Sequence, residues 1–192
     1  MRRLARWSAL ALALAAVLTV SASESAEPEL PASLIGDFVV KIATYDKNLV
    51  ARARPRARVV VLQRRDDVVS ARVALGVAAR LRQQETIAGL PMEVEVLTAG
   101  TAAELATSCR ADHIAVVVLS SGFEDRLLEI ASALDHVDVL TFGVLGSYAQ
   151  HGAVVALDVR EGKPRIIVNL ARARSQNVAL SADLLKLAQV LP

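Results

Sequence analysis

The sequence predicts a three-layer α/β domain with a mostly parallel sheet, of flavodoxin-like or Rossmann-like order, and an antiparallel hairpin near the C-terminus. Short apolar runs alternate with segments of helical periodicity, and short loops join them, as in a parallel sheet with helical crossovers. Hydrophobic residues make up 54% of the chain, enough for a core. Two strand-like segments flank Gly162, which supplies the backbone freedom of a tight turn.

The first 22 residues are typical of a cleaved signal peptide. Three arginines and no acidic residue begin it, an apolar run follows, and Ala22 closes a small-residue cleavage signature. The apolar run is short for a bilayer span, so an uncleaved membrane anchor is the alternative. We therefore expect an exported, periplasmic chain cut near Ala22, with residues 23–31 as a linker and residues 32–192 as a single domain.

Removal of this segment changes the charge of the chain. The sequence has 22 basic and 20 acidic residues, and the signal peptide holds three of the arginines. The mature chain is then close to neutral, and aromatic residues make up only 3%. Neither property supports nucleic-acid binding, which relies on basic surfaces and stacking rings.

The first half of the domain predicts two helices around a buried strand. Apolar residues of 34–53 recur at helical spacing, and Pro55 prevents that helix from continuing. Val59–Leu62 is short and wholly apolar, as expected of a buried strand. After a charged loop, apolar residues four positions apart predict the second helix (Val69, Val73, Val77 and Leu81).

The middle of the domain continues the alternation of strands and helices. Residues 92–97 alternate apolar side chains with glutamates, which predicts a strand with one polar side. Residues 113–119 form the most apolar run of the body and predict the central strand. The remaining spacing predicts helices at 101–107 and 124–134, a strand at 137–142 and a loop at 143–150.

The last forty or so residues predict a hairpin, a short helical segment and a closing helix. Residues 155–159 and 166–170 alternate on either side of the turn. Leucines and an alanine then fall on one helical face (Leu180, Leu184, Leu187, Ala188 and Leu191). Ser181 is placed to cap this helix, and Pro192 ends it.

Catalytic and metal-binding motifs do not occur in the sequence. It contains no glycine-rich nucleotide fingerprint, phosphate-binding loop or nucleophile elbow. His113, His136 and His151 lie far apart, without metal-ligand spacing. The single cysteine, Cys109, cannot form an internal disulfide, and we interpret it as a packed thiol with a redox role as the alternative. We therefore predict no catalytic residue, metal or cofactor.

Two loops are candidates for a ligand or partner site. Each follows a predicted buried strand (Gln63, Arg64, Arg65, Asp66 and Asp67 after the first, Ser120, Ser121 and Gly122 after the central one). Open α/β sheets bind ligands outside the carboxyl ends of their strands, where the strand order reverses. In a flavodoxin-like order the two loops face each other, so their amides and hydroxyls could hold a carboxylate or phosphate. The alternative is that a serine caps the next helix.

The C-terminal block resembles the YfiR family of exported bacterial proteins. The similar residues include Val139–Phe142, Tyr148, Gly152 and a strand ending at Asn169 before a leucine-rich segment. The apolar strand that follows Cys109 also resembles the family. The similarity is strongest over about the last sixty residues, and it implies structural roles for Gly152 and Asn169.

This resemblance implies a periplasmic domain without catalysis. Members of the family restrain a membrane diguanylate cyclase by binding its periplasmic sensor region, and an outer-membrane OmpA-like lipoprotein sequesters them. The implied partners are therefore an inner-membrane diguanylate cyclase or sensor kinase and such a lipoprotein, with a homodimer as a further form. The role implied is control of cyclic-di-GMP signalling and biofilm formation in response to envelope or redox stress.

A periplasmic small-molecule binding protein is the alternative function. It predicts a pocket between the two candidate loops. The chain departs from the family at its lone Cys109 and over residues 52–67. We therefore expect partner specificity to lie in residues 52–67.

Overall fold

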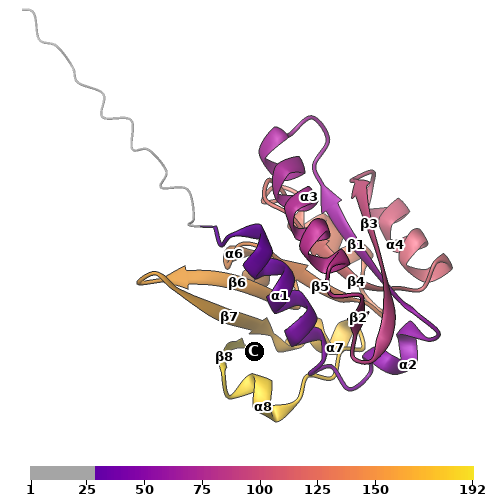
Figure 1. The fold of residues 1–192 in the computed structure, drawn as a ribbon, viewed down its shortest axis with the longest axis vertical. Coiled ribbons are helices and arrows are strands. Elements are labelled where there is room, and N and C mark those ends of the chain that lie inside the picture. Colours follow the sequence, from indigo (N-terminus) through magenta and orange to yellow (C-terminus); the bar gives the residue numbers. More distant parts are fainter. Residues whose placement is uncertain (1–28) are drawn as a thin grey trace, which may run out of the picture.

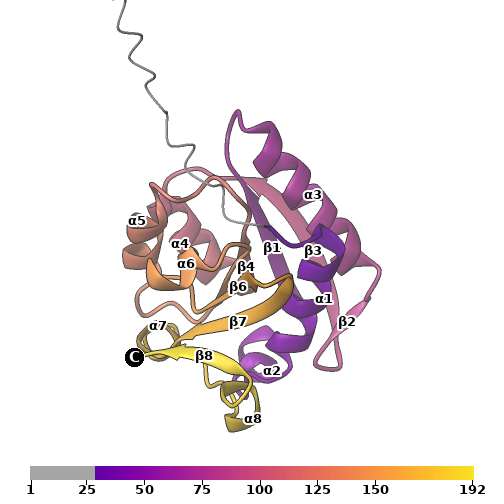
Figure 2. The same cartoon turned by 90° about the vertical axis from the view of Figure 1, so that its left-hand side faces the viewer.

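One eight-stranded sheet runs through residues 29–192, the part of the chain that the computed structural model describes (Figure 1). The expected signal peptide and residues 23–28 of the expected linker lie outside the described residues. Helices lie on both sides of the sheet, with α1 and α3 on one side and α4, α5 and α6 on the other (Figure 2). The expected three-layer α/β architecture is confirmed.

The chain forms eight helices and eight strands within these residues. The helices are α1 (Ala32–Ala43), α2 (Leu49–Ala53), α3 (Val68–Arg82), α4 (Ala102–Ala111), α5 (Leu127–Ala133), α6 (Ser147–Gln150), α7 (Leu170–Ser175) and α8 (Ala182–Leu185). The strands are β1 (Ala57–Gln63), β2 (Thr86–Ile87), β3 (Leu90–Thr98), β4 (Ile114–Leu119), β5 (Leu140–Gly143), β6 (Val155–Arg160), β7 (Lys163–Asn169) and β8 (Ala188–Leu191).

The parallel strands have the flavodoxin-like order. The sheet runs β2-β3-β1-β4-β5-β6-β7-β8, and β3, β1, β4, β5 and β6 are parallel to one another. Among these five, the first strand in the chain lies between the second and the third. The strand order therefore reverses at β1, and the carboxyl ends of β1 and β4 form the topological switch point at which such sheets place their sites.

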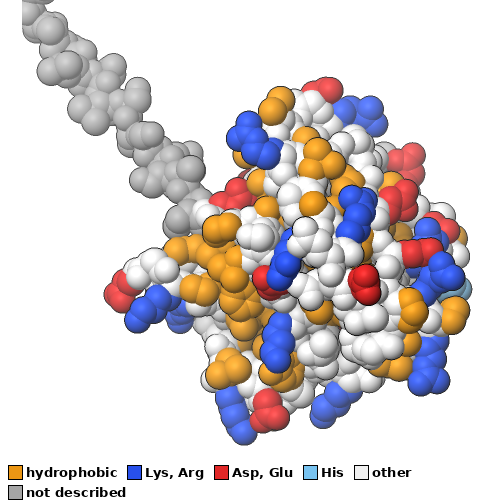
Figure 3. Space-filling view, in the orientation of Figure 1, with side chains coloured by type: hydrophobic (Ala, Val, Ile, Leu, Met, Phe, Trp, Pro, Cys, Tyr) orange, Lys and Arg blue, Asp and Glu red, His pale blue; other side chains and the backbone are white. Residues whose placement is uncertain are grey.

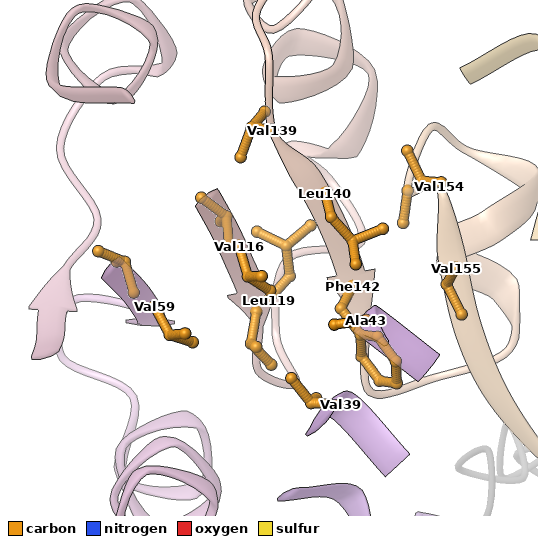
Figure 4. Close-up of a cluster of buried hydrophobic side chains, with 14 of the residues drawn as sticks. Val39, Ala43, Val59, Val116, Leu119, Val139, Leu140, Phe142, Val154 and Val155 are labelled. Atoms are coloured by element: carbon orange, nitrogen blue, oxygen red, sulfur yellow. The ribbon is translucent and has the colours of Figure 1, made fainter. Parts of the chain in front are cut away.

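The core is built around β4. All six residues of this strand are buried, as its unbroken apolar sequence predicts. Figure 4 shows Val116 and Leu119 of β4 near Leu140 and Phe142 of β5, with Val39 of α1 close by. Packing of α1 against the sheet thus helps to fix the strands whose ends form the switch point.

The antiparallel hairpin also forms as expected. Strands β6 and β7 pair from Val155↔Val168 to Arg160↔Lys163. The two turn residues, Glu161 and Gly162, both have positive φ, of 53° and 72°. This is the backbone of a two-residue turn whose twist matches the flanking strands.

The expected closing helix is wrong beyond Leu185. Helix α8 ends there, and Ala188–Leu191 forms β8, which pairs in parallel with β7. Leu187, assigned to the apolar face of that helix, is 71% exposed. Leucine spacing fits a helix locally, but β7 offers an unpaired backbone edge that only a strand can satisfy. Ser181 precedes α8, but its side chain makes no capping hydrogen bond.

Two smaller expectations also change. The expected helix at 34–53 divides into α1 and α2, because the buried carboxylate of Asp46 turns the chain between them: its Oδ1 accepts from the backbone N–H groups of Asn48 at 3.0 Å and Ala179 at 2.9 Å. The expected loop at 143–150 contains the short helix α6.

Candidate functional site

The switch point brings the two predicted loops together. A chain of three hydrogen bonds joins them: the Arg64 N–H donates to Ser70 Oγ at 2.7 Å, the Ser70 and Ser120 hydroxyls lie 2.7 Å apart, and Ser120 Oγ donates to the Leu62 carbonyl at 2.7 Å. Both serine side chains are buried. The hydroxyl of Ser120 therefore serves the protein's own structure.

The guanidinium of Arg64 spans the space between the two loops. It donates to the Gly122 carbonyl and forms a two-pronged pair with Asp125, in which Nη2 lies 2.9 Å from Oδ2. The hydrogen bond from Arg64 lowers the pKa of the Asp125 carboxyl, and the pKa of Arg64 rises in return. The two loops are thus held together by a charge-assisted contact between their own residues.

Gly122 and Asp67 fit together beneath this pair. Gly122 has a φ of 89°, and a Cβ added there would lie 2.6 Å from Asp67 Oδ2. The other oxygen of Asp67 accepts from the N–H groups of Val69 and Ser70 at 2.9 Å and caps α3. Asp67 is therefore a helix cap in this structure, in a position that leaves no room for a side chain at 122.

Gln63, Arg65 and Asp66 face outward, whereas Ser121 is partly buried and its Oγ is shielded from solvent beside Glu29. Gln63 Nε2 donates to Thr98 Oγ1 at 2.9 Å, while Arg65 and Asp66 are exposed. Val68 and Val69 follow at the start of α3 and are 73% and 53% exposed. The loop 63–67 and Val68 line a shallow hollow. We refer to Arg65, Asp66, Val68 and Val69 as the β1–α3 surface.

Tyr148 supports the crevice from below, a role that the sequence analysis did not assign. Its buried hydroxyl accepts from the Phe123 N–H at 3.0 Å and lies 3.1 Å from both the Ser120 carbonyl and Glu124 Oε1. Burial raises the pKa of Tyr148. Because Tyr148 falls in a segment predicted to be a loop, no apolar periodicity in the sequence marks it as buried. Its position in α6 shows this role.

Glu29 has a partly buried carboxylate that lies near Ser121 and Glu124. Burial raises its pKa, and the nearby charge of Glu124 raises it further. The start of the described chain therefore lies against the switch point. In the sequence Glu29 falls in a polar, linker-like segment, which gives no sign of this contact.

An apolar hollow of about 190 Å³ adjoins the switch point. Leu62 and Leu97, at the ends of β1 and β3, line it together with Leu105 and Ile130. Arg126 lies at its wall and donates to the Gly100 carbonyl at 2.7 Å. This hollow is next to the predicted site rather than between its two loops.

The three other residues singled out from the sequence occupy structural positions. Cys109 lies in α4 with 3% exposure, and burial raises the pKa of its thiol to about 12. Gly152 has a φ of 126°, and a Cβ there would collide with Ala131. Asn169 caps α7 by accepting from Arg172 N–H, and its Nδ2 donates to the Ala149 carbonyl, both at 2.9 Å. A redox role for Cys109 stays a prediction.

A second exposed apolar surface lies at the C-terminal side of the sheet. Hydrophobic side chains gather where α1 runs beside β6 and β7 (Figure 3). A hollow of about 340 Å³ there is lined by Phe38, Pro164, Ile166, Leu187 and Ala188 together with three polar residues. Strand β8 is the last strand of the sheet on this side.

Within residues 29–192 no three His, Cys, Asp or Glu side chains are grouped as metal ligands would be. None of the helices described in this range has the length and apolar character needed to cross a bilayer.

The fold is an α/β domain built on an open sheet. At its switch point the two loops are joined by the chain's own side chains, among them Arg64 and Asp125. The family comparison is more specific. The model of the YfiR/HmsC-like family matches residues 32–189, and the chain belongs to that family. The expected resemblance is thus confirmed and extends well beyond the last sixty residues. A comparison with curated protein sequences finds no match.

Solved structures with a similar fold include three of low sequence identity. One is a conserved domain protein from Vibrio cholerae (TM-score 0.60, 13% identity, 84% of this chain and 60% of that one). Another is the ABC domain from Streptococcus pneumonia in complex with L-Trp (TM-score 0.59, 12% identity, 84% of this chain and 60% of that one). The third is the ligand-free, open structure of CD0873 from Clostridium difficile, a substrate binding protein with adhesive properties (TM-score 0.54, 10% identity, 76% of this chain and 57% of that one). This chain therefore spans about 60% of the length of such neighbours, which support the fold.

Proposed function

We propose that this chain is a non-catalytic periplasmic regulator that restrains an inner-membrane diguanylate cyclase by binding its periplasmic sensor region. Membership of the YfiR/HmsC-like family over residues 32–189 supports this function. In the same proposal, residues 1–22 direct export, and an outer-membrane OmpA-like lipoprotein relieves the restraint by sequestering the chain.

The internal contacts at the switch point favour a protein, and not a small ligand between the loops, as the partner of this chain. Ser120 and Asp67 are occupied by internal hydrogen bonds, and Arg64 spans the crevice to Asp125. A ligand between the loops would have to break these contacts. The β1–α3 surface instead presents two exposed valines beside two exposed charges, the mixture of apolar contact and charge that protein interfaces use. We propose this surface as the contact for the sensor region.

The test replaces the exposed valines by aspartates. Val68→Asp/Val69→Asp adds charge to the first turn of α3, where acidic residues favour the helix, so the fold is expected to persist. Cells producing this variant should show the raised cyclic-di-GMP of cells that lack the chain, and binding of the purified variant to the cyclase's sensor region should weaken at least tenfold.

Leu75→Asp is the matched control. Leu75 lies further along α3 and is 56% exposed, so this variant adds a charge to the same helix outside the β1–α3 surface. It should restrain the cyclase as the wild type does. Unchanged cyclic-di-GMP in cells that lack the chain would contradict the regulatory function, and equal effects of both variants would contradict the assigned surface.

The small-molecule alternative rests on the apolar hollow beside the switch point. Its apolar lining and the guanidinium of Arg126, which also pairs with Glu129 at 3.6 Å, suit a small apolar ligand that carries a carboxylate, and one structural neighbour was solved with L-Trp. A ligand from a panel of free amino acids should raise the melting temperature, and Leu105→Trp, which fills the hollow, should abolish the rise. No shift with any member of the panel would contradict this alternative.

A further inference from the structure

Another hollow lies at the opposite end of the sheet, before the amino ends of β4 and β5. Its volume is about 500 Å³. It is lined mainly by polar residues from α2, α4 and the loops that precede β4 and β5 (Ala51, Arg52, Arg54, Cys109, Arg110, His113, His136, Val137 and Asp138). We call it the basic hollow. Lys and Arg side chains and a histidine lie among Asp and Glu side chains at the edge of the molecule nearest α2 (Figure 3).

Most arginines near this hollow are neutralised by the chain's own carboxylates. In the sequence Arg52-Ala-Arg-Pro-Arg-Ala-Arg58, Arg52 pairs with Asp46, Arg56 with Glu93, and Arg58 with Asp112 at 3.2 Å. Arg54 alone in this run has no ion pair among the described residues, and it lines the basic hollow.

Arg110 adds a second unpaired guanidinium. It lies in the last turn of α4 and forms no ion pair or hydrogen bond within the described part of the chain. Since α4 ends beside the hollow, it presents carbonyl groups and not amides there. The positive charge therefore comes from the arginine side chains. Asp138 is the single carboxylate among the lining residues.

Arg52 supplies an independent sign of a missing partner. Its side chain is 6% exposed, and it is held by Asp46 and by the Asn177 carbonyl. Its Nε is nevertheless buried without a hydrogen-bond partner among the described residues. Buried N–H groups are nearly always satisfied, so an acceptor that enters the hollow would complete this site.

We propose that the basic hollow binds a small oxyanion that carries a phosphate group. Guanidinium groups suit phosphate because their N–H donors match its oxygens in pairs. Two unpaired guanidinium groups and an orphan buried N–H outweigh the one carboxylate that lines the hollow. This inference concerns the end of the sheet opposite the β1–α3 surface and does not rest on the proposed regulatory function.

The experiment is calorimetric titration of the purified chain with inorganic phosphate at constant ionic strength, with chloride as the reference anion. Arg54→Gln/Arg110→Gln should weaken phosphate binding at least tenfold. Arg72→Gln/Arg174→Gln is the matched control, since it removes two exposed arginines elsewhere and changes the net charge equally. The control should bind within twofold of the wild type.

Three outcomes would overturn the proposal. The first is phosphate binding no stronger than chloride binding. The second is an equal loss in both double variants, which would reflect net charge alone. The third is binding only to phosphatidylglycerol vesicles and not to free phosphate, which would make the surface a membrane contact.

Discussion

At the scale of single residues, Gly162 and Gly152 differ in how much a substitution is expected to destabilise the fold. Gly162 has a φ of 72° with nothing near its missing Cβ, whereas Gly152 has a φ of 126° and lies against Ala131 in α5. Both need a backbone that other residues adopt reluctantly. At Gly152 the strain is combined with a collision.

Gly152→Ala should therefore be far more harmful than Gly162→Ala. We expect a loss of about 2–4 kcal/mol in the free energy of unfolding for Gly152→Ala and about 1 kcal/mol for Gly162→Ala. Urea denaturation followed by circular dichroism measures both. The double variant Gly152→Ala/Ala131→Gly should recover part of the loss, and no recovery would mean that backbone strain alone is responsible.

Glu29 gives a pH dependence whose sign follows from its burial. Because burial raises its pKa above the usual value of 4.5, the folded chain holds a proton that the unfolded chain has lost just above that pH. Stability therefore falls as the pH rises through this window. Glu29→Gln should raise the melting temperature at pH 7 by about 1–3 °C, with the gain absent at pH 4.

Glu161→Gln is the comparison for this measurement, since Glu161 is exposed in the hairpin turn. Its melting temperature should follow that of the wild type across the pH range. A gain for Glu29→Gln that persists at pH 4 would show that the effect does not arise from the charge on Glu29.

At the scale of elements, the sequence predicted the strands and loops whose signals are local. Val59–Leu62 and Ile114–Leu119 are apolar runs that can only be buried, and both form central strands. Their order in the sheet then brings together the two loops that follow them, as a flavodoxin-like order requires. That these loops close on each other through Arg64 could not be predicted, because it depends on the position of Asp125 in space.

The C-terminal strand β8 shows the opposite case. Residues 188–191 are compatible with a helix and with a strand when read alone, and pairing with β7 decides between them. Tertiary pairing of this kind overrides leucine spacing because it satisfies backbone groups of β7 from Ile166 to Asn169.

Val190→Ala distinguishes the two structures. Val190 is in β8 and 39% exposed, and alanine favours helices over strands. In a strand the change should cost about 0.5–1 kcal/mol, whereas in a helix it would stabilise. Ala103→Val, in the exposed face of α4, should destabilise because that segment is a helix. Stabilisation by Val190→Ala in urea denaturation would contradict β8.

At the scale of the whole molecule, the two ends of the domain are joined by one buried carboxylate. Asp46, between α1 and α2, is 4% exposed and pairs with Arg52. It also accepts from the N–H of Ala179 at 2.9 Å, near the bridge between Asp46 and Leu180. The opening helices and the closing segment therefore depend on the same side chain, although more than 130 residues separate Asp46 from Ala179.

Asp46→Asn should consequently destabilise the domain as one unit. Removing the charge leaves the guanidinium of Arg52 buried without its counterion, which costs about 3–5 kcal/mol. Asp183→Asn is the control, because its pair with Lys186 is exposed and should contribute less than about 1 kcal/mol. Hydrogen exchange should show loss of protection in α1, β7 and β8 together. Loss confined to residues 177–191 would mean that the closing segment unfolds independently and that Asp46 holds only that segment to a domain stable without it.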